Sequence, residues 1–296
     1  MSKRRITLTK SDKIQLWGIL RDFNRSHRYR EMQRPANHRR LWLKCSDALV
    51  QKVANPGYYD SIVNSQLTYP NPSFQQIEVD LNRTFPHIQD EAQLEALTTP
   101  LKNVLSAFVV RNPTVGYCQG VNFIAARLLT CMNEEEAFWT LNQIIEKYLP
   151  LDYYSNMVGV LVDQKVLQIY MQRRLPKLCE HLQANDFSLD LVAFQWIVCL
   201  FASNLPQSIG FAVWDLFFIK GIVVLFRVAL TILSLMQDEI LQTNKFEEIY
   251  FIIENYCGTK LDIRTMMEKF ADPISIKEVE RLRKEQRVII MEVLKR

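Results

Sequence analysis

Two stretches carry most of the information in this chain of 296 residues: residues 77–86 have the sequence IEVDLNRTFP, and residues 112–123 have the sequence NPTVGYCQGVNF. In the first, Asp80 and Arg83 are three positions apart, a spacing that places both side chains on one face if the segment is helical. In the second, Gln119 lies on a turn marked by Pro and Gly, directly before an apolar segment. The second stretch therefore predicts a turn that leads into a helix.

Helical patterns also dominate the rest of the chain. Apolar residues recur at three- and four-residue intervals, strand-like alternation never extends beyond a few residues, and only eight Gly are present. The predicted fold class is therefore all-α, a many-helix bundle. Helices are expected from Asn37 onward and over residues 11–32, 91–110, 121–132, 134–148, 160–183 (kinked near Pro176), 189–202, 207–219, 223–237, 245–255 and 276–294.

The expected domain organisation has three parts. Residues 1–36 form a basic N-terminal segment, and residues 37–260 form the main domain. Residues 261–296 form a helical C-terminal extension that packs on the main domain or continues it. Within the main domain, the loop composition around Leu149–Tyr153 predicts a boundary between two helical lobes near residue 150.

Charge is distributed unevenly along the chain. Residues 1–44 contain 13 Lys and Arg against three Asp and Glu, whereas the remainder contains 23 against 29. A basic end can bind nucleic acid or an anionic membrane surface. No glycine-aromatic RNA-binding motif or zinc-finger spacing accompanies it, so nucleic acid is not an expected partner. A solvated segment is the favoured interpretation, with peripheral membrane association as an accessory function of the same segment.

Several kinds of site find no support in the sequence. The six Cys include no C-x-x-C pair and the first ten residues hold no apolar signal segment, so the cysteines are expected to be reduced in a cytoplasmic protein. The four His are far apart and lack neighbours at metal-ligand spacing, so no metal site is expected. The long uncharged stretch 191–214 is interrupted at Asn204-Leu205-Pro206, which favours two buried helices over a membrane span.

Spacing alone leaves both motifs with ordinary interpretations. An Asp and an Arg on one helical face are most often a surface ion pair that stabilises little, and a Gln in a loop usually has its amide in water. The continuation of each motif changes this interpretation: T-F-P follows Arg83, and Y-C precedes Gln119. The I-x-x-D-x-x-R-T-F-P and Y-x-Q-G patterns resemble the signature motifs of the TBC domain family, the GTPase-activating proteins of Rab GTPases.

The resemblance covers residues 37–260. Arg39 and Trp42 match the family's R-x-x-W element, and Trp214-Asp215 match its W-D element. The resemblance implies a supporting role for Arg39 and Trp42. A departure is Ala212, because many members carry an Arg two residues before the W-D Trp; this puts partner choice and local packing in doubt rather than the chemistry. Further matching elements are AFW at 137–139, PKL at 176–178, QW at 195–196, LP at 205–206 and LFRVAL at 225–230.

The resemblance implies an all-α domain of two helical lobes that stimulates GTP hydrolysis by a Rab-family GTPase and so regulates vesicle trafficking. Arg83 would be the arginine finger that stabilises charge in the transition state, and Gln119 the glutamine finger that orients the attacking water. Asp80 would hold Arg83 in position, while Tyr117 and Asn122 would support the loop of Gln119.

The chain itself contains no G-x-x-x-x-G-K-[ST] nucleotide-binding loop. GTP and Mg²⁺ are therefore expected to be bound by the partner, a Rab-type small GTPase in its GTP-bound form, and no cofactor is expected on this chain. The expected location is the cytoplasm, with recruitment to membranes. The alternative function is a catalytically silent scaffold of the same fold that binds a small GTPase without activating it.

Overall fold

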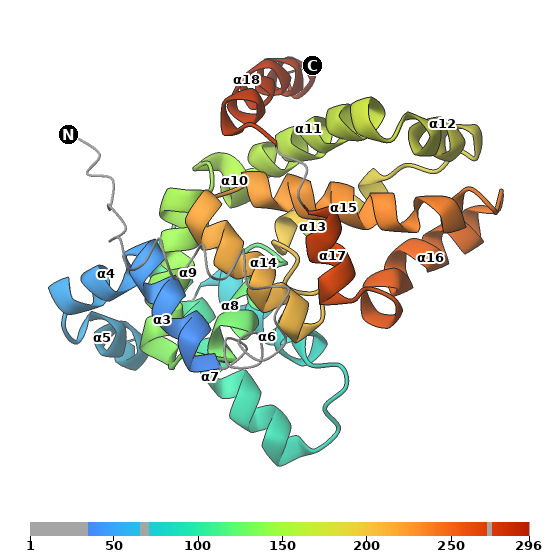
Figure 1. Cartoon of the computed structure of the whole chain (residues 1–296). Helices are drawn as coiled ribbons and strands as arrows, with labels where there is room; N and C mark the ends of the chain where they lie inside the picture. Colours follow the sequence, from blue (N-terminus) through green and yellow to red (C-terminus); the bar gives the residue numbers. More distant parts are fainter. Residues whose placement is uncertain (1–34, 66–70, 271–273, 296) are drawn as a thin grey trace.

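The computed structural model of the protein describes residues 35–65, 71–270 and 274–295. In this part every regular element is a helix, which confirms the all-α prediction (Figure 1). The predicted helix over residues 11–32 lies outside the described residues. The elements are α3 (Pro35–Ser46), α4 (Ala48–Ala54), α5 (Tyr58–Ser65), α6 (Pro72–Thr84), α7 (Glu91–Arg111), α8 (Val121–Leu129), α9 (Glu134–Gln143) with the π-helical turn η3 (Ile144–Tyr148), α10 (Asp152–Ser155), α11 (Val158–Arg174), α12 (Pro176–Ala184), α13 (Asp190–Val198), α14 (Gln207–Lys220), α15 (Val223–Ile240), α16 (Phe246–Thr259), α17 (Ile263–Lys269) and α18 (Ile276–Val293).

Side-chain caps explain where α6 and α7 begin. The side chain of Asn71 accepts a hydrogen bond from the backbone N–H of Ser73 at 2.9 Å, and Pro72 occupies the first helical turn, where its missing N–H is not needed. Asp90 caps α7 in the same way, because its carboxylate accepts from the N–H of Gln93 at 2.7 Å. The first motif is therefore helical as far as Thr84, and α7 matches the helix predicted over residues 91–110.

Two predicted helices are each divided in the structure. The helical segment that opens at Asn37 is interrupted at Asp47, whose left-handed φ of 65° separates α3 from α4. The helix predicted over residues 160–183 is not one kinked helix but two, α11 and α12. The break lies at Leu175, with φ −130° and ψ 53°, because the residue before a proline is held out of the helical region.

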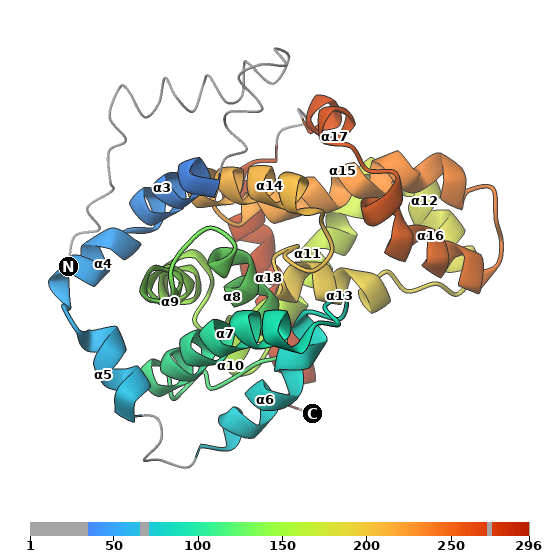
Figure 2. The ribbon, with the colours of Figure 1, turned by 90° about the horizontal axis from the view of Figure 1, so that it is seen from below.

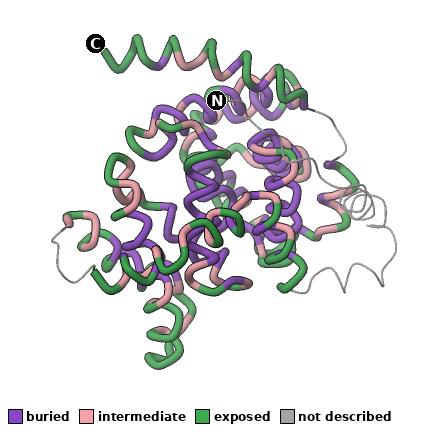
Figure 3. The backbone as a smooth tube through the Cα atoms, turned by 90° about the vertical axis from the view of Figure 1, so that its left-hand side faces the viewer, coloured by how far each residue is buried: buried purple, intermediate pink, exposed green. Residues whose placement is uncertain are grey.

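Helix α8 begins within the second motif and contacts α6, which carries most of the first motif, as well as α7 and α9. Its residues are almost all buried, including Asn122. Figure 2 shows α8 in the interior beside α7, and Figure 3 shows buried residues concentrated in the interior while exposed residues follow α18. Across the chain, α3 packs on α14. The lobe boundary near residue 150 stays a prediction.

The uncharged stretch 191–214 falls on α13 and the first part of α14, with the predicted Asn204-Leu205-Pro206 junction between them. Helix α14 is largely buried, as predicted, whereas α13 buries one face, with Trp196, and exposes Leu191 and Phe194 on the other. None of the described helices is long and apolar enough to span a membrane.

The C-terminal helix α18 lies along α11 (Figure 1). Arg283 donates two hydrogen bonds to the carboxylate of Asp163, each 2.6 Å long, and Arg287 is paired with Asp152. The side chain of Asp163 is 2% exposed, so the Arg283 pair is a buried contact between α18 and α11. The C-terminal residues are thus held to the rest of the fold by charge as well as by packing.

Candidate functional site

Helix α6 presents Arg83 to solvent at its last turn. Ile77 and Leu81 face the core, and the side chain of Arg83 is 65% exposed. One turn earlier, Asp80 is almost completely buried, and its Oδ1 atom lies 3.7 Å from Nη1 of Arg83. Among the described residues, this Oδ1 accepts no hydrogen bond within normal range. The carboxylate therefore attracts the guanidinium without fixing it, and Arg83 remains free to reach outward.

The loop from Asn112 to Gly120 presents Gln119 in an exposed position. The backbone takes positive φ angles at Gly116 (64°) and at Gly120 (111°), which disfavour residues with a Cβ atom. Space also demands a glycine at the second position. A Cβ atom on Gly120 would lie 3.3 Å from both methyl groups of Val198 at the end of α13. Close packing against α13 thus fixes the backbone next to Gln119.

Two hydrogen-bonded links join this loop to α6. The hydroxyl of Tyr117 donates to Oδ2 of Asp80 at 3.0 Å. The side-chain amide of Asn122 donates to Oγ1 of Thr84 at 2.8 Å. These links lie on either side of Arg83 along α6, so the two motifs, 36 positions apart, meet at one place on the molecule.

The protonation state of Tyr117 follows from its surroundings. Burial raises the pKa of the Tyr117 phenol well above its ordinary value of 10.0, and the neighbouring Asp80 carboxylate raises it further. The phenol is therefore a hydrogen-bond donor at neutral pH. A protonated phenol stabilises the buried carboxylate of Asp80, which in turn faces Arg83.

Arg39 and Trp42 bind partners on other helices. Arg39 donates two hydrogen bonds to Glu136 on α9, from Nε at 2.7 Å and from Nη2 at 2.5 Å. The fully buried Trp42 donates from its indole N–H to Asp215 at 2.7 Å. Nδ1 of His38 lies 3.0 Å from the same carboxylate. The R-x-x-W and W-D elements therefore join α3 to α9 and α14 and have a structural role.

Ala212 is buried on α14, and a different arginine lies close to this helix. Arg127 on α8 donates from Nη2 to the carbonyl oxygens of Ala202 and Leu205, at 2.6 and 2.8 Å. Burial lowers its pKa to about 10. A Cβ atom on Gly210 would lie 3.0 Å from the guanidinium carbon, so α14 approaches this group closely because the residue is a glycine.

Sequence reasoning missed the contributions of Thr84, His38 and Arg127. The R-T-F-P motif contains Thr84 but does not reveal its partner, which is 38 positions away. The pairing of the W-D Asp with His38 and Trp42 was likewise absent from the prediction, since it joins positions 173 or more residues apart.

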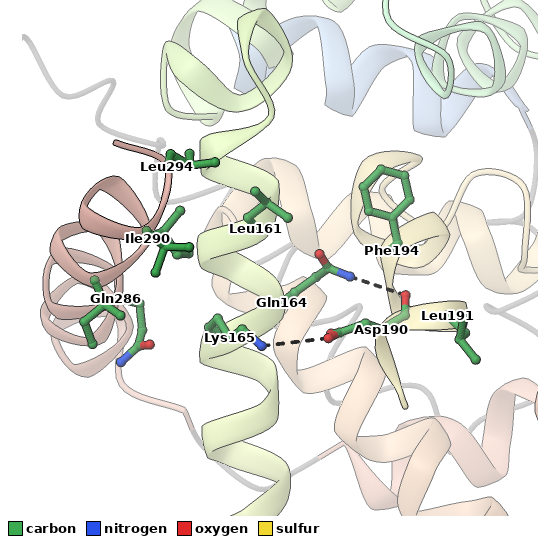
Figure 4. A pocket seen from close by; sticks show the side chains of 11 residues that line it. Leu161, Gln164, Lys165, Asp190, Leu191, Phe194, Gln286, Ile290 and Leu294 are labelled. Carbon is green, nitrogen blue, oxygen red and sulfur yellow. Dashed lines mark hydrogen bonds and ion pairs between the residues drawn. The ribbon is translucent and has the colours of Figure 1, made fainter. Parts of the chain in front are cut away.

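A separate hollow of about 530 Å³ lies between α11, α13 and α18 (Figure 4). Its walls are mainly apolar, with Leu161, Phe194 and Ile290 among them, and its polar contacts are the Lys165–Asp190 ion pair at 3.8 Å and a hydrogen bond from Gln164 to the carbonyl of Asp190. None of the candidate site residues lines it.

Comparison with known proteins identifies the domain. The model of the Rab-GTPase-TBC domain matches residues 37–241. The human protein "TBC1 domain family member 2A" is 37% identical over 277 residues, and the human "TBC1 domain family member 2B" is 33% identical over 254 residues. These alignments cover 90% and 83% of this chain but only 30% and 26% of the relatives, so the chain spans less than a third of their length.

Solved structures give the same result. The flagellar RabGAP TBC domain of Chlamydomonas is 28% identical and superposes with a TM-score of 0.72 over 89% of this chain and 91% of its own. The Ypt/Rab-GAP domain of Gyp1p has a TM-score of 0.66 over 91% and 93% of the two chains; at 19% identity it supports the fold alone. The protein described here is a member of the Rab-GTPase-TBC domain family.

Proposed function

We propose that this chain accelerates GTP hydrolysis by a Rab-type small GTPase, to which it supplies Arg83 and Gln119. Membership of the Rab-GTPase-TBC family supports a GTPase partner. The observation that supports the proposal is the pair of links from Tyr117 to Asp80 and from Asn122 to Thr84, because they join the helix turn that carries the exposed Arg83 to the segment that carries the exposed Gln119.

Each side chain suits its proposed task. The guanidinium of Arg83 stays charged and can contact more than one phosphoryl oxygen, so it would stabilise the negative charge that develops there. The carboxamide of Gln119 both donates and accepts hydrogen bonds, so it would orient the attacking water. An arginine finger supplied in trans is worth about 10³–10⁵ in rate, or roughly 4–7 kcal/mol of barrier. GTP and Mg²⁺ belong to the partner in this mechanism.

The cellular setting is part of the same proposal. Stimulation of GTP hydrolysis on a Rab would be a cytoplasmic activity with a role in vesicle trafficking, and the basic residues 1–36 would favour an anionic membrane surface. Because the chain spans less than a third of its curated relatives, these statements concern this domain rather than the activity of a longer protein.

Single-turnover GTP hydrolysis by a panel of Rab GTPases, with and without the purified chain, tests the proposal. Acceleration of at least one GTP-loaded Rab is expected. Stable binding to a GTP-loaded Rab with no change in rate across the panel would favour the scaffold, and neither binding nor acceleration would contradict both functions.

A further inference from the structure

A continuous set of three hydrogen bonds connects α6 to the backbone beside Gln119. The hydroxyl of Thr84 donates to the carbonyl oxygen of Asp80 at 2.7 Å, and the side-chain amide of Asn122 donates to that hydroxyl at 2.8 Å. The side-chain carbonyl of Asn122 accepts from the backbone N–H of Gly120 at 2.9 Å. Because this N–H belongs to the peptide bond between Gln119 and Gly120, the set ends on the peptide group of the glutamine itself.

The two side chains in the middle of this set are buried. Thr84 is 9% exposed and Asn122 is 1% exposed, so water does not replace these contacts easily. The hydroxyl of Thr84 both donates and accepts here, which a methyl group in the same volume cannot do. Thr84 also directly follows Arg83 in the chain. One hydroxyl thus connects the last turn of α6 to the peptide of Gln119.

We propose that Thr84 is a positioning residue for Gln119. Its hydroxyl fixes the distance between the turn that carries Arg83 and the peptide that carries the glutamine, and it does not touch the partner. This inference rests on the proposed function. Displacements of about 1 Å in catalytic groups reduce rates on the order of 10²-fold, so a small shift of this peptide is enough to matter.

A purely structural role for Thr84 predicts a different pattern of effects. Loss of stability lowers activity whether or not Gln119 is present. A positioning residue acts through the glutamine, so substitution of Thr84 has no further effect on the rate once the carboxamide of Gln119 has been removed. The two roles are therefore separated by comparing the same substitution in two backgrounds.

The experiment measures the maximal stimulated rate at a saturating concentration of the chain, using a Rab whose GTP hydrolysis the wild-type chain accelerates. Thr84→Val is expected to lower this rate about 10- to 100-fold with little change in the half-saturating concentration, and Thr84→Ser is expected to stay within about threefold of wild type. In a Gln119→Ala background, Thr84→Val should change the rate less than about threefold. An equal loss in both backgrounds, or full activity of Thr84→Val, would overturn the proposal.

Thr231 on α15 offers a matched control. It is also buried, and its hydroxyl donates to the carbonyl oxygen of Arg227 four residues earlier at 2.7 Å. Thr231→Val removes the same kind of helical hydrogen bond at a place remote in sequence from both motifs. Its stimulated rate should remain within about threefold of wild type, since additive behaviour is expected of a distant site.

A second measurement needs no partner. In the free chain, Thr84→Val should accelerate hydrogen exchange of the Gly120 amide by at least about tenfold, with Thr84→Ser close to wild type, because local opening controls exchange. Unchanged exchange at Gly120 would contradict the inference directly. If the chain accelerates GTP hydrolysis by no Rab in the panel but the exchange pattern is as expected, the connection from Thr84 to the Gln119 peptide stands and only the proposed function is contradicted.

Discussion

The hydroxyl of Tyr117 lies 3.0 Å from Oδ2 of Asp80, across the junction between α6 and the loop of Gln119. Asp80 divides its two oxygens between the motifs, because Oδ2 accepts from Tyr117 while Oδ1 faces Arg83 at 3.7 Å. One buried carboxylate therefore contacts both halves of the candidate site.

Removal of either finger should abolish most of the stimulated hydrolysis. Arg83→Ala and Gln119→Ala are each expected to reduce the single-turnover rate by at least about a hundredfold, while binding to the GTP-bound Rab survives. Arg83→Lys should remain strongly impaired, because lysine keeps the charge but lacks the planar fork. Equal rates for wild type and Arg83→Ala would remove the finger assignment.

Tyr117→Phe should destabilise the chain. The substitution takes a donor from a carboxylate that is 1% exposed and leaves Oδ2 of Asp80 with a weak contact from Gln76 at 3.4 Å. A buried acceptor that loses its partner costs about 1–3 kcal/mol, measurable as a lower free energy of unfolding in urea. Stimulated hydrolysis should fall as well, and an unchanged unfolding midpoint would argue against this account.

Gly120→Ala should be more harmful than Gly57→Ala. Both glycines have positive φ, 111° at Gly120 and 72° at Gly57. A Cβ atom added at Gly120 would lie 3.3 Å from Val198, whereas a Cβ atom added at Gly57 would have no neighbouring atom within 4 Å. The backbone strain and crowding at Gly120 should cost about 1–3 kcal/mol, against about 1 kcal/mol at Gly57. Thermal unfolding of the two variants gives the comparison, and equal losses would show that Val198 adjusts freely.

The pair formed by Arg39 and Glu136 should make stability depend on pH. Burial alone raises the pKa of Glu136, but the hydrogen bonds and charge of Arg39 outweigh it, so the pKa lies below its ordinary value of 4.5. The folded chain thus binds fewer protons than the unfolded chain near that value. The stabilisation is present above pH 4.5 and is lost as the pH falls through the lowered pKa.

Arg39→Met tests this pH dependence. The side chain of Arg39 is 44% exposed, so solvent screens the ion pair. The substitution should therefore lower the free energy of unfolding at pH 7 by only about 1–2 kcal/mol. The difference in unfolding free energy between Arg39→Met and wild type, measured in urea, should become smaller below pH 4.5. A difference that stays constant from pH 7 to pH 3.5 would exclude Glu136 as its source.

The contact between α18 and α11 should depend on Arg283. Arg283→Met leaves the carboxylate of Asp163, 2% exposed, without its ionic partner and should cost about 3–5 kcal/mol. Arg281→Met is a suitable control on the same helix, because its ion pair with Glu285 is about half exposed on both sides and should contribute less than about 1 kcal/mol. Similar losses in both variants would show that Asp163 is solvated.

Much of the fold was predictable because long amphipathic helices repeat their apolar residues with a helical period. The errors occurred where a single residue ends a helix, as at Asp47 and Leu175. The short helices α5, α10 and α17 were missed for another reason. Such short segments are unstable alone and depend on tertiary packing, as the buried Tyr59 and Met266 indicate.

The candidate site was likewise predictable only in part. The R-T-F-P and Y-x-Q-G motifs identified Arg83 and Gln119 from the sequence, whereas their coupling through Thr84 and Asn122 depends on a contact between residues 38 positions apart. No local pattern specifies such a contact. The catalytic assignments of Arg83 and Gln119 stay predictions until a stimulated rate is measured.

The two glycines around Gln119 also affect how tightly a partner can bind. Because Gly120 packs on α13 and Tyr117 donates a hydrogen bond to Asp80 on α6, we expect the main chain of this loop to be ordered before a partner binds. Docking then has to immobilise the two exposed side chains, at about 0.5–1.5 kcal/mol each, rather than a whole segment. Such preordering favours affinity, because little main-chain freedom remains to be lost when a partner binds.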